Sequence, residues 1–166
     1  MAEPIIRKSG IIDVEFGDNV TVVEPVNLYG CEVGANSFIG PFVEIQRNAV
    51  IGAGTRVQSH SFICELVTIG DDCFVGHGVM FINDWFLGGK PAFDRKDLWI
   101  PTTVGNSVSI GSNATILPVS ICDRVVVGAG SVVTRDIEES GVYLGNPARF
   151  IRPFSAVDLD RNMADL

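Results

Sequence analysis

An aliphatic residue recurs at every sixth position along most of this 166-residue chain, and this period constrains the fold more than any other feature. A period of six fits neither an α-helix of 3.6 residues per turn nor a strand whose side chains alternate between two faces. It fits a short strand and a turn, repeated, with the aliphatic side chain pointing into a shared interior. The longest unbroken run consists of Val33, Ile39, Ile45, Ile51, Val57, Ile63, Ile69, Val75 and Phe81.

The same frame extends in both directions from this run. It reaches back to Phe16, with one five-residue side between Leu28 and Val33. It resumes at Val104 and continues to Val133 with one slip after Ile116, which makes 18 sides in all. Three sides close one coil, so the sequence predicts an all-β fold, a parallel β-helix of about six coils. We expect residues 1–15 to cap the first coil, because a bare solenoid end invites pairing with another chain. A second inward position is predicted at Ser37, Val43, Ala49, Thr55, Ser61, Val67, Cys73, Val79, Val108, Ala114 and Ser131.

Two segments leave the six-residue frame. Residues 82–103 form one long insertion, which is predicted to protrude as a loop and contains both tryptophans of the chain. Long excursions from a compact scaffold are usually functional, although aromatic residues could also simply pack on the wall of the prism. The chain after Val133 is predicted to fold back as a short C-terminal extension. We therefore expect one domain over residues 1–152 and a polar tail over 153–166, either helical or frayed.

Composition excludes several classes of protein. The net charge is −8 and the chain has no lysine or arginine run, which disfavours a nucleic-acid partner. No stretch approaches the roughly 20 apolar residues of a membrane span, and the start of the chain lacks a signal-peptide pattern. The four cysteines, Cys31, Cys64, Cys73 and Cys122, contain no Cys-x-x-Cys pair. We expect reduced, buried thiols in a cytoplasmic protein.

The chain resembles the bacterial hexapeptide-repeat acyltransferases in its six-residue frame, in the loop that begins near Asn83, and in residues 128–134 and 145–149. Segment 76–84, Gly-His-Gly-Val-Met-Phe-Ile-Asn-Asp, is most similar to the nucleotide-sugar N-acetyltransferases of that superfamily. The resemblance implies left-handed coils, a homotrimer, and acetyl-CoA as co-substrate in a groove between two subunits. It also implies acetylation of an amino group on a nucleotide-linked deoxysugar, with no metal.

The resemblance also implies roles for residues around the loop. Asn83 matches the asparagine that such enzymes place beside the acceptor amine, where its side-chain oxygen can accept a hydrogen bond. His77 could transfer the proton, unless the amine arrives neutral and needs no strong base. Asp84 could orient His77 or bind a substrate hydroxyl. His60 precedes His77 by 17 residues, which predicts adjacent coils near one edge and a structural or substrate-contact role.

The remaining expected contacts lie in the loop and near the C-terminus. Relatives often carry a proline–arginine pair after the loop asparagine, and this chain lacks it. Either Lys90 or Arg95 replaces that arginine, with Trp85 nearby, or its role is absent. The family's cofactor contacts map to the coils around Gly111, Ala129 and Thr134. Guanidinium groups pair strongly with phosphate, which makes three residues candidates for the cofactor's phosphates. These are Arg135, Arg149 and Arg152.

Three other functions compete with N-acetylation. An O-acetyltransferase acting on a sugar or small alcohol would need a true general base, so His77 or His60 would become indispensable. A γ-type carbonic anhydrase would need three histidines around zinc, and the chain has two. A non-catalytic trimeric scaffold would need neither the aromatic loop nor the segment at residues 146–149.

Overall fold

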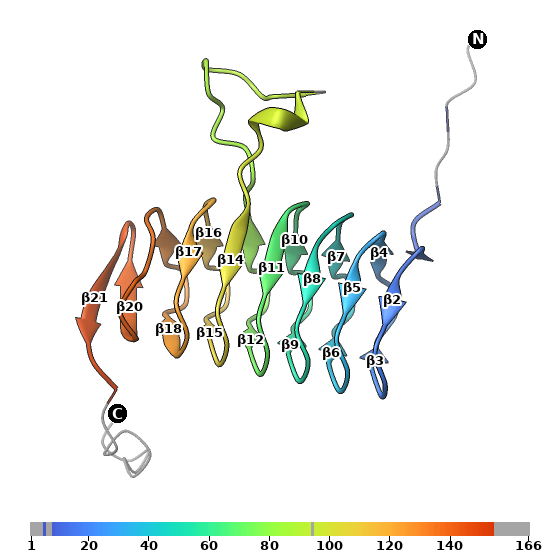
Figure 1. Ribbon diagram of the computed structural model, residues 1–166, viewed down its shortest axis with the longest axis horizontal. Coiled ribbons are helices and arrows are strands. Elements are labelled where there is room, and N and C mark those ends of the chain that lie inside the picture. Colours follow the sequence, from blue (N-terminus) through green and yellow to red (C-terminus); the bar gives the residue numbers. More distant parts are fainter. Residues whose placement is uncertain (1–4, 6–7, 94, 155–166) are drawn as a thin grey trace.

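The computed structural model describes residues 5, 8–93 and 95–154, which form a column of stacked three-sided coils (Figure 1). Strands of successive coils pair in parallel, and the one antiparallel pairing in the described part joins the last two strands. The expected all-β parallel β-helix is therefore confirmed. The described residues include no helix that is both long and apolar enough to cross a membrane.

Three sheets form the walls of the column. Sheet A contains, in spatial order, β1 (Ile11–Ile12), β4 (Asn27–Tyr29), β7 (Glu44–Ile45), β10 (Phe62–Ile63), β13 (Met80–Phe81), β16 (Thr115–Ile116) and β19 (Val132–Val133). Sheet B contains β17 (Ser120–Ile121), β14 (Thr102–Val104), β11 (Val67–Ile69), β8 (Val50–Ile51), β5 (Glu32–Val33) and β2 (Glu15–Phe16). Sheet C contains β21 (Ala148–Arg152), β20 (Gly141–Gly145), β18 (Val125–Val127), β15 (Ser109–Ile110), β12 (Phe74–Val75), β9 (Arg56–Val57), β6 (Phe38–Ile39) and β3 (Thr21–Val22).

The number of coils agrees with the sequence period, but the N-terminal end differs from expectation. The 18 strands from β2 to β19, three per coil, make the six predicted coils. Strand β1 does not lie across the first coil as a cap. It pairs in parallel with β4, where Ile11 lies opposite Leu28, and so begins sheet A one level earlier. Phe16 was expected to point into the core but is 41% exposed, because no complete coil lies beneath it.

The interior is a narrow stack of the predicted aliphatic residues. From Val33 to Val133, every aliphatic residue of the frame is 2% exposed or less. The polar residues at the second inward position are also buried, and their hydroxyl groups are paired. Ser37 and Thr55 each donate to a glycine carbonyl of the next coil, at 2.9 Å, and Ser61 does the same at 2.8 Å. A buried hydroxyl without such an acceptor would be costly, so these bonds make the small polar residues compatible with the core.

Turns stacked on one another form three edges. The CA edge, where the chain passes from sheet C to sheet A, consists of residues 23–25, 40–42, 58–60, 76–78, 111–113 and 128–130. The AB edge consists of residues 30–31, 46–48, 64–66, 82–101, 117–119 and 134–136, and the BC edge of residues 17–19, 34–36, 52–54, 70–72, 105–107 and 122–124. Many of these turns contain one residue with positive φ, usually Gly, Asn or Asp, which adopt that conformation at the lowest cost.

The insertion and the C-terminal extension both lie outside this regular pattern. The loop protrudes from the AB edge (Figure 1) and covers residues 82–101, two residues less than predicted, because Thr102 and Thr103 pair with β11. It contains a short 3-10 helix, η1 (Lys96–Leu98). At the other end of the chain, β20 stacks in parallel on β18 and β21 folds back on β20, as the predicted extension requires. Most of the predicted polar tail lies outside the described residues.

Candidate active site

His77 lies exposed on the CA edge, in the turn between β12 and β13. Its Nδ1 is 2.8 Å from Oγ of Ser59, which occupies the equivalent position one coil earlier. The backbone supports this geometry, because the amide N–H of Gly78 donates to the backbone carbonyl oxygen of Ser59 at 3.0 Å. A ring held through Nδ1 is fixed in orientation and leaves Nε2 for a substrate.

His60 occupies the same edge one coil before His77, as their spacing predicts. It makes no contact with His77 that would couple the two rings. Its imidazole instead stacks on Phe42, with ring centroids 4.9 Å apart and the planes inclined by 28°. The structure thus places His60 beside an aromatic side chain that the sequence did not single out.

Asn83 lies on the AB edge, at the point where the chain leaves β13 and enters the loop. Its side-chain Nδ2 donates to the backbone oxygen of Glu65 at 3.1 Å, and its own backbone oxygen accepts from Ile100 at 2.9 Å. The second bond closes the base of the loop. The first fixes the amide orientation, and within the described chain no donor reaches Oδ1. Asn83 can therefore present a hydrogen-bond acceptor to a ligand.

Asp84 organises the loop from within. Its Oδ1 accepts from the amide of Phe86 and its Oδ2 from the amide of Ala92, each at 2.8 Å. Both oxygens are thus engaged with the loop backbone. Asp84 does not pair with His77 within the chain. Each of its carboxylate oxygens accepts one amide hydrogen bond and can accept another, so binding of a substrate hydroxyl by Asp84 stays a prediction.

A charged contact ties the 3-10 helix η1 of the loop to the column. The ammonium group of Lys96 lies 2.7 and 2.9 Å from the two carboxylate oxygens of Glu65, and 4.8 Å from the ring centroid of Trp99. Three expected acceptor contacts, Trp85, Lys90 and Arg95, are exposed on the loop. Arg95 forms an exposed ion pair with Asp97 at 2.6 Å, so Lys90 is the more available cation.

The two central candidates do not meet within one chain. His77 and Asn83 stand at the two edges of sheet A, with strand β13 between them. The six residues from His77 to Asn83 span up to about 20 Å when extended, so the two side chains cannot bind the same reacting group within one chain. The cofactor candidates divide in the same way: Gly111 and Ala129 lie on the CA edge, while Thr134 and Arg135 lie on the AB edge.

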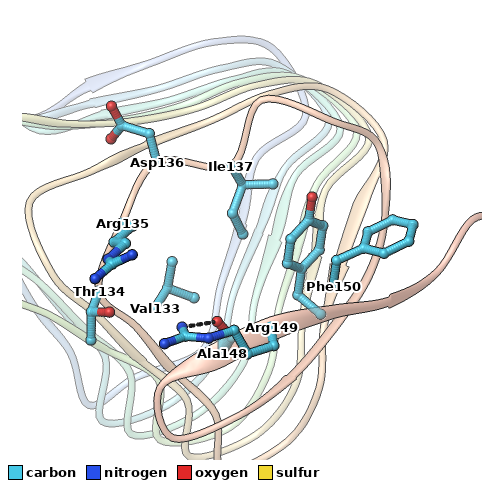
Figure 2. A pocket seen from close by; sticks show the side chains of 9 residues that line it. Val133, Thr134, Arg135, Asp136, Ile137, Ala148, Arg149 and Phe150 are labelled. Atoms are coloured by element: carbon cyan, nitrogen blue, oxygen red, sulfur yellow. Dashed lines mark hydrogen bonds between the residues drawn. The ribbon is translucent and has the colours of Figure 1, made fainter.

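Thr134, Arg135 and Arg149 line one pocket at the C-terminal end of the column (Figure 2). Its volume is about 190 Å³, and its other lining residues are Val133, Asp136, Ile137, Tyr143, Ala148 and Phe150. Neither Arg135 nor Arg149 forms an ion pair within the described part of the chain. Two guanidinium groups at one pocket could hold phosphate groups. Arg152 lies on β21 and is not among the residues that line this pocket. Its guanidinium group donates to the backbone oxygen of Pro153.

Sequence reasoning missed the two residues that support His77 and Asn83. Ser59 precedes His77 by one coil of 18 residues, and Glu65 precedes Asn83 by the same spacing. The coil length would have identified both as neighbours. The described residues also contain no group of three or more His, Cys, Asp or Glu side chains placed to hold a metal ion.

Comparison with known proteins identifies the family. A family model described as the hexapeptide repeat of succinyl-transferase matches residues 66–80 and 101–135. A second, described as bacterial transferase hexapeptide (six repeats), matches residues 30–65, so that the two together cover just over half of the chain. The chain belongs to the bacterial hexapeptide-repeat transferases.

Individual relatives agree with this assignment. The bifunctional protein GlmU of Carboxydothermus hydrogenoformans is 34% identical over 141 residues, which are 84% of this chain and 29% of that protein. The chain thus spans less than a third of the length of this relative. A hexapeptide-repeat acetyltransferase of Vibrio cholerae, solved with acetyl-CoA, is 26% identical with a TM-score of 0.62, over 76% of this chain and 72% of that one. The predicted resemblance to the hexapeptide-repeat family is confirmed.

One further solved structure shares the fold at lower identity. AntD, an N-acyltransferase of Bacillus cereus, aligns with a TM-score of 0.74 at 19% identity, over 88% of this chain and 87% of that one. At this identity the likeness concerns the fold alone.

Proposed function

We propose that the protein transfers the acetyl group of acetyl-CoA to the amino group of a nucleotide-linked deoxy-aminosugar. The observation that carries this proposal is the fixed side-chain amide of Asn83. Its Nδ2 is held by Glu65, so its Oδ1 can accept a hydrogen bond from an amine and aim the nitrogen lone pair. The Vibrio cholerae relative supports acetyl-CoA as the donor.

The reaction makes limited demands on the protein. The amine nitrogen attacks the thioester carbonyl carbon, the carbon–sulfur bond breaks, and the sulfur leaves as the thiol of coenzyme A. The nitrogen loses one proton, and the sulfur gains one. If Nδ1–H of His77 donates its hydrogen bond to Oγ of Ser59, the ring carries its proton on Nδ1. Nε2 is then unprotonated and can take the proton released by the amine nitrogen. A neutral amine would need this base less than a hydroxyl would.

The division of the site between two edges supports a homotrimer. Each site would combine the CA edge of one subunit, carrying His77, Gly111 and Ala129, with the AB edge of its neighbour, carrying Asn83 and Arg135. A groove between two prisms is the arrangement that brings both edges to one substrate. Gly111 and Ala129 would allow the cofactor to lie close to the backbone, and Arg135 and Arg149 would bind its phosphates.

Electrostatics favours the CA edge for anionic ligands. From position 40 to position 130 no turn residue of that edge is a carboxylate, whereas the BC edge carries Asp71, Asp72 and Asp123. The CA side of the proposed groove therefore adds little repulsion of a nucleotide or of coenzyme A there, while the AB side carries the carboxylates of Glu65 and Asp136. The four free thiols fit a reducing compartment, and we assign the protein to the cytoplasm.

O-acetylation of a sugar or small alcohol is the second candidate, and the pairing of His77 with Ser59 is the observation that favours it. A hydroxyl of high pKa needs a base as it attacks, and an oriented imidazole would supply one.

The test measures thiol release from acetyl-CoA in the presence of aminosugar nucleotides and of matched hydroxysugar nucleotides. Release with the amines alone supports N-acetylation, and release with the hydroxyl compounds alone supports the second candidate. Sedimentation at micromolar protein concentration should show a trimer. A monomer that retains full activity would contradict a site built from two chains.

A further inference from the structure

Phe42 and His60 form an exposed aromatic pair on the CA edge. Their rings stack at 4.9 Å from turns of successive coils, and Phe42 is 57% exposed despite having one ring face against His60. No step of the proposed reaction uses this pair. An exposed, preformed stack offers a planar ligand a surface that is already ordered.

The backbone at these positions is unusual for such side chains. Phe42 and His60 have φ values of 60° and 64°, in the left-handed region. The later turns of the same edge place Gly78, Asn113 and Gly130 at this position, which are residues that adopt it readily. Phenylalanine is disfavoured there, so the turn itself does not account for the ring at position 42.

A hollow of about 230 Å³ borders Phe42 and has a polar side. It is lined by Ser9, Pro25, Val26, Asn27, Phe42, Val43 and Glu44. The amide of Asn27 donates to the carboxylate of Glu44 at 3.0 Å, so both groups are held in place. An aromatic ring beside an ordered amide and carboxylate suits a planar heterocycle, whose face stacks and whose edge forms hydrogen bonds.

The pair also lies at a suitable distance from His77. Phe42, His60 and His77 belong to three successive coils, so Phe42 and His77 are about 10 Å apart along the column at the usual strand spacing. A ribose and a diphosphate can bridge that distance. The turn residues between them, at positions 58–60 and 76–78, include no carboxylate that would repel the phosphates.

We infer that the Phe42–His60 pair, together with the hollow beside Phe42, is the nucleobase subsite for the acceptor. This inference rests on the proposed function, since it names the part of the protein that recognises the nucleotide of the acceptor. The sugar would extend from this subsite along the CA edge towards His77, and the cofactor would approach from the side of Gly111 and Ala129.

The test measures dissociation constants of UDP and dTDP by calorimetry. Phe42→Ala should weaken whichever nucleotide binds by roughly tenfold, which is within the range for loss of one aromatic stack. Phe42→Tyr keeps the ring and should retain the affinity. Phe74→Ala, which removes an exposed phenyl group from β12, is the matched control and should bind as the wild type does. Inorganic pyrophosphate should bind equally to all four proteins.

Three outcomes would overturn the inference. The first is equal nucleotide affinity in wild type and Phe42→Ala. The second is a Phe42→Ala protein that no longer sediments as the wild type does, which would make the pair a contact between copies of the chain. The third is a wild-type protein that binds neither nucleotide yet acetylates free aminosugars, which would leave the transferase assignment intact. Failure of acetyl transfer to every amine tested would instead count against the proposed function.

Discussion

Oγ of Ser59 lies 2.8 Å from Nδ1 of His77, one coil away along the same edge of the column. This contact fixes the imidazole by one nitrogen and leaves the other exposed. It also arises directly from the repeat, because residues one coil apart stack on each other. The pair is therefore a point at which the regular scaffold orients a candidate catalytic group.

Ser59→Ala should lower turnover by roughly tenfold if His77 takes the proton, because the ring loses the partner that sets its orientation and tautomer. The acetyl-CoA dissociation constant should stay within about twofold. Ser120→Ala, which removes an exposed hydroxyl from β17, is the control and should leave both quantities unchanged. Steady-state kinetics for turnover and calorimetry for acetyl-CoA binding would check this. An unchanged turnover would show that the bond has no catalytic role.

Replacement of Asn83 and His77 separates the two proposed reactions. If the acceptor is an amine that binds neutral, Asn83→Ala should reduce turnover by about a hundredfold, while His77→Asn retains a substantial rate. If the acceptor is a hydroxyl, His77→Asn should be the more damaging change. Calorimetry should show acetyl-CoA binding in both variants. A His77→Asn protein that is folded, binds cofactor and is inactive towards every aminosugar would rule out the neutral-amine mechanism.

Lys96→Ala should loosen the loop without unfolding the protein. Lys96 pairs with Glu65, whose side chain is only 12% exposed, and this contact joins η1 to the column. An ion pair with one exposed partner contributes less than about 1 kcal/mol, so the melting temperature should change little. Chymotrypsin should cleave near Phe86 or Phe93 faster than in the wild type, and the acceptor KM should rise several-fold.

Arg95→Ala is the matched control for this change. Arg95 also forms an ion pair in the loop, but its partner Asp97 is exposed and belongs to the same segment. Losing that pair should not free the loop from the column. If the two variants are cleaved at the same rate, the contact between Lys96 and Glu65 does not hold the loop.

The fold could be predicted from the sequence because one short period determines nearly every inward position. Ile51 and Ile110 lie in different coils but occupy the same kind of site, and both are buried as the frame requires. The prediction failed where the repeat ends. Phe16 fits the frame yet remains exposed, because burial depends on a neighbouring coil that a local pattern does not describe.

The candidate site could be predicted only in part. His77 and Asn83 were identifiable from their segment, but their placement at opposite edges of sheet A follows from the three-sided coil. The two bonds of Asp84 to Phe86 and Ala92 depend on the path of an irregular loop, which no period encodes. The stack of Phe42 on His60 could have been predicted, since the two residues are 18 positions, or one coil, apart.

The register of the column can be tested with two substitutions to aspartate. Ile51 is 1% exposed, so Ile51→Asp should bury an unpaired charge and lower the free energy of unfolding by several kcal/mol. Arg47 is exposed on the AB edge, and Arg47→Asp should change the free energy of unfolding by less than about 1 kcal/mol. Urea denaturation followed by circular dichroism would measure both. Equal tolerance of the two changes would contradict the register.

Stability at alkaline pH should depend on Cys64. Burial is the main cause that raises the pKa of this thiol from an ordinary value of 9.0 to about 12. Between these two values the unfolded chain has released the thiol proton while the folded protein retains it. The folded state then binds more protons than the unfolded state, so the free energy of unfolding falls as pH rises. The contribution is fully present below pH 9 and is lost progressively towards pH 12.

Cys64→Ala should remove this component of the pH dependence. The variant will be less stable than the wild type near pH 8, because it loses buried atoms from the core. As pH rises to 11, the difference in free energy of unfolding between the two proteins should shrink, since only the wild type loses the thiol contribution. Cys122→Ala is the control, because Cys122 is only half-buried and its thiol should contribute a weaker slope. Denaturant titrations at pH 8, 9, 10 and 11 would measure the three curves, and parallel curves for wild type and Cys64→Ala would show that the buried thiol does not couple folding to pH.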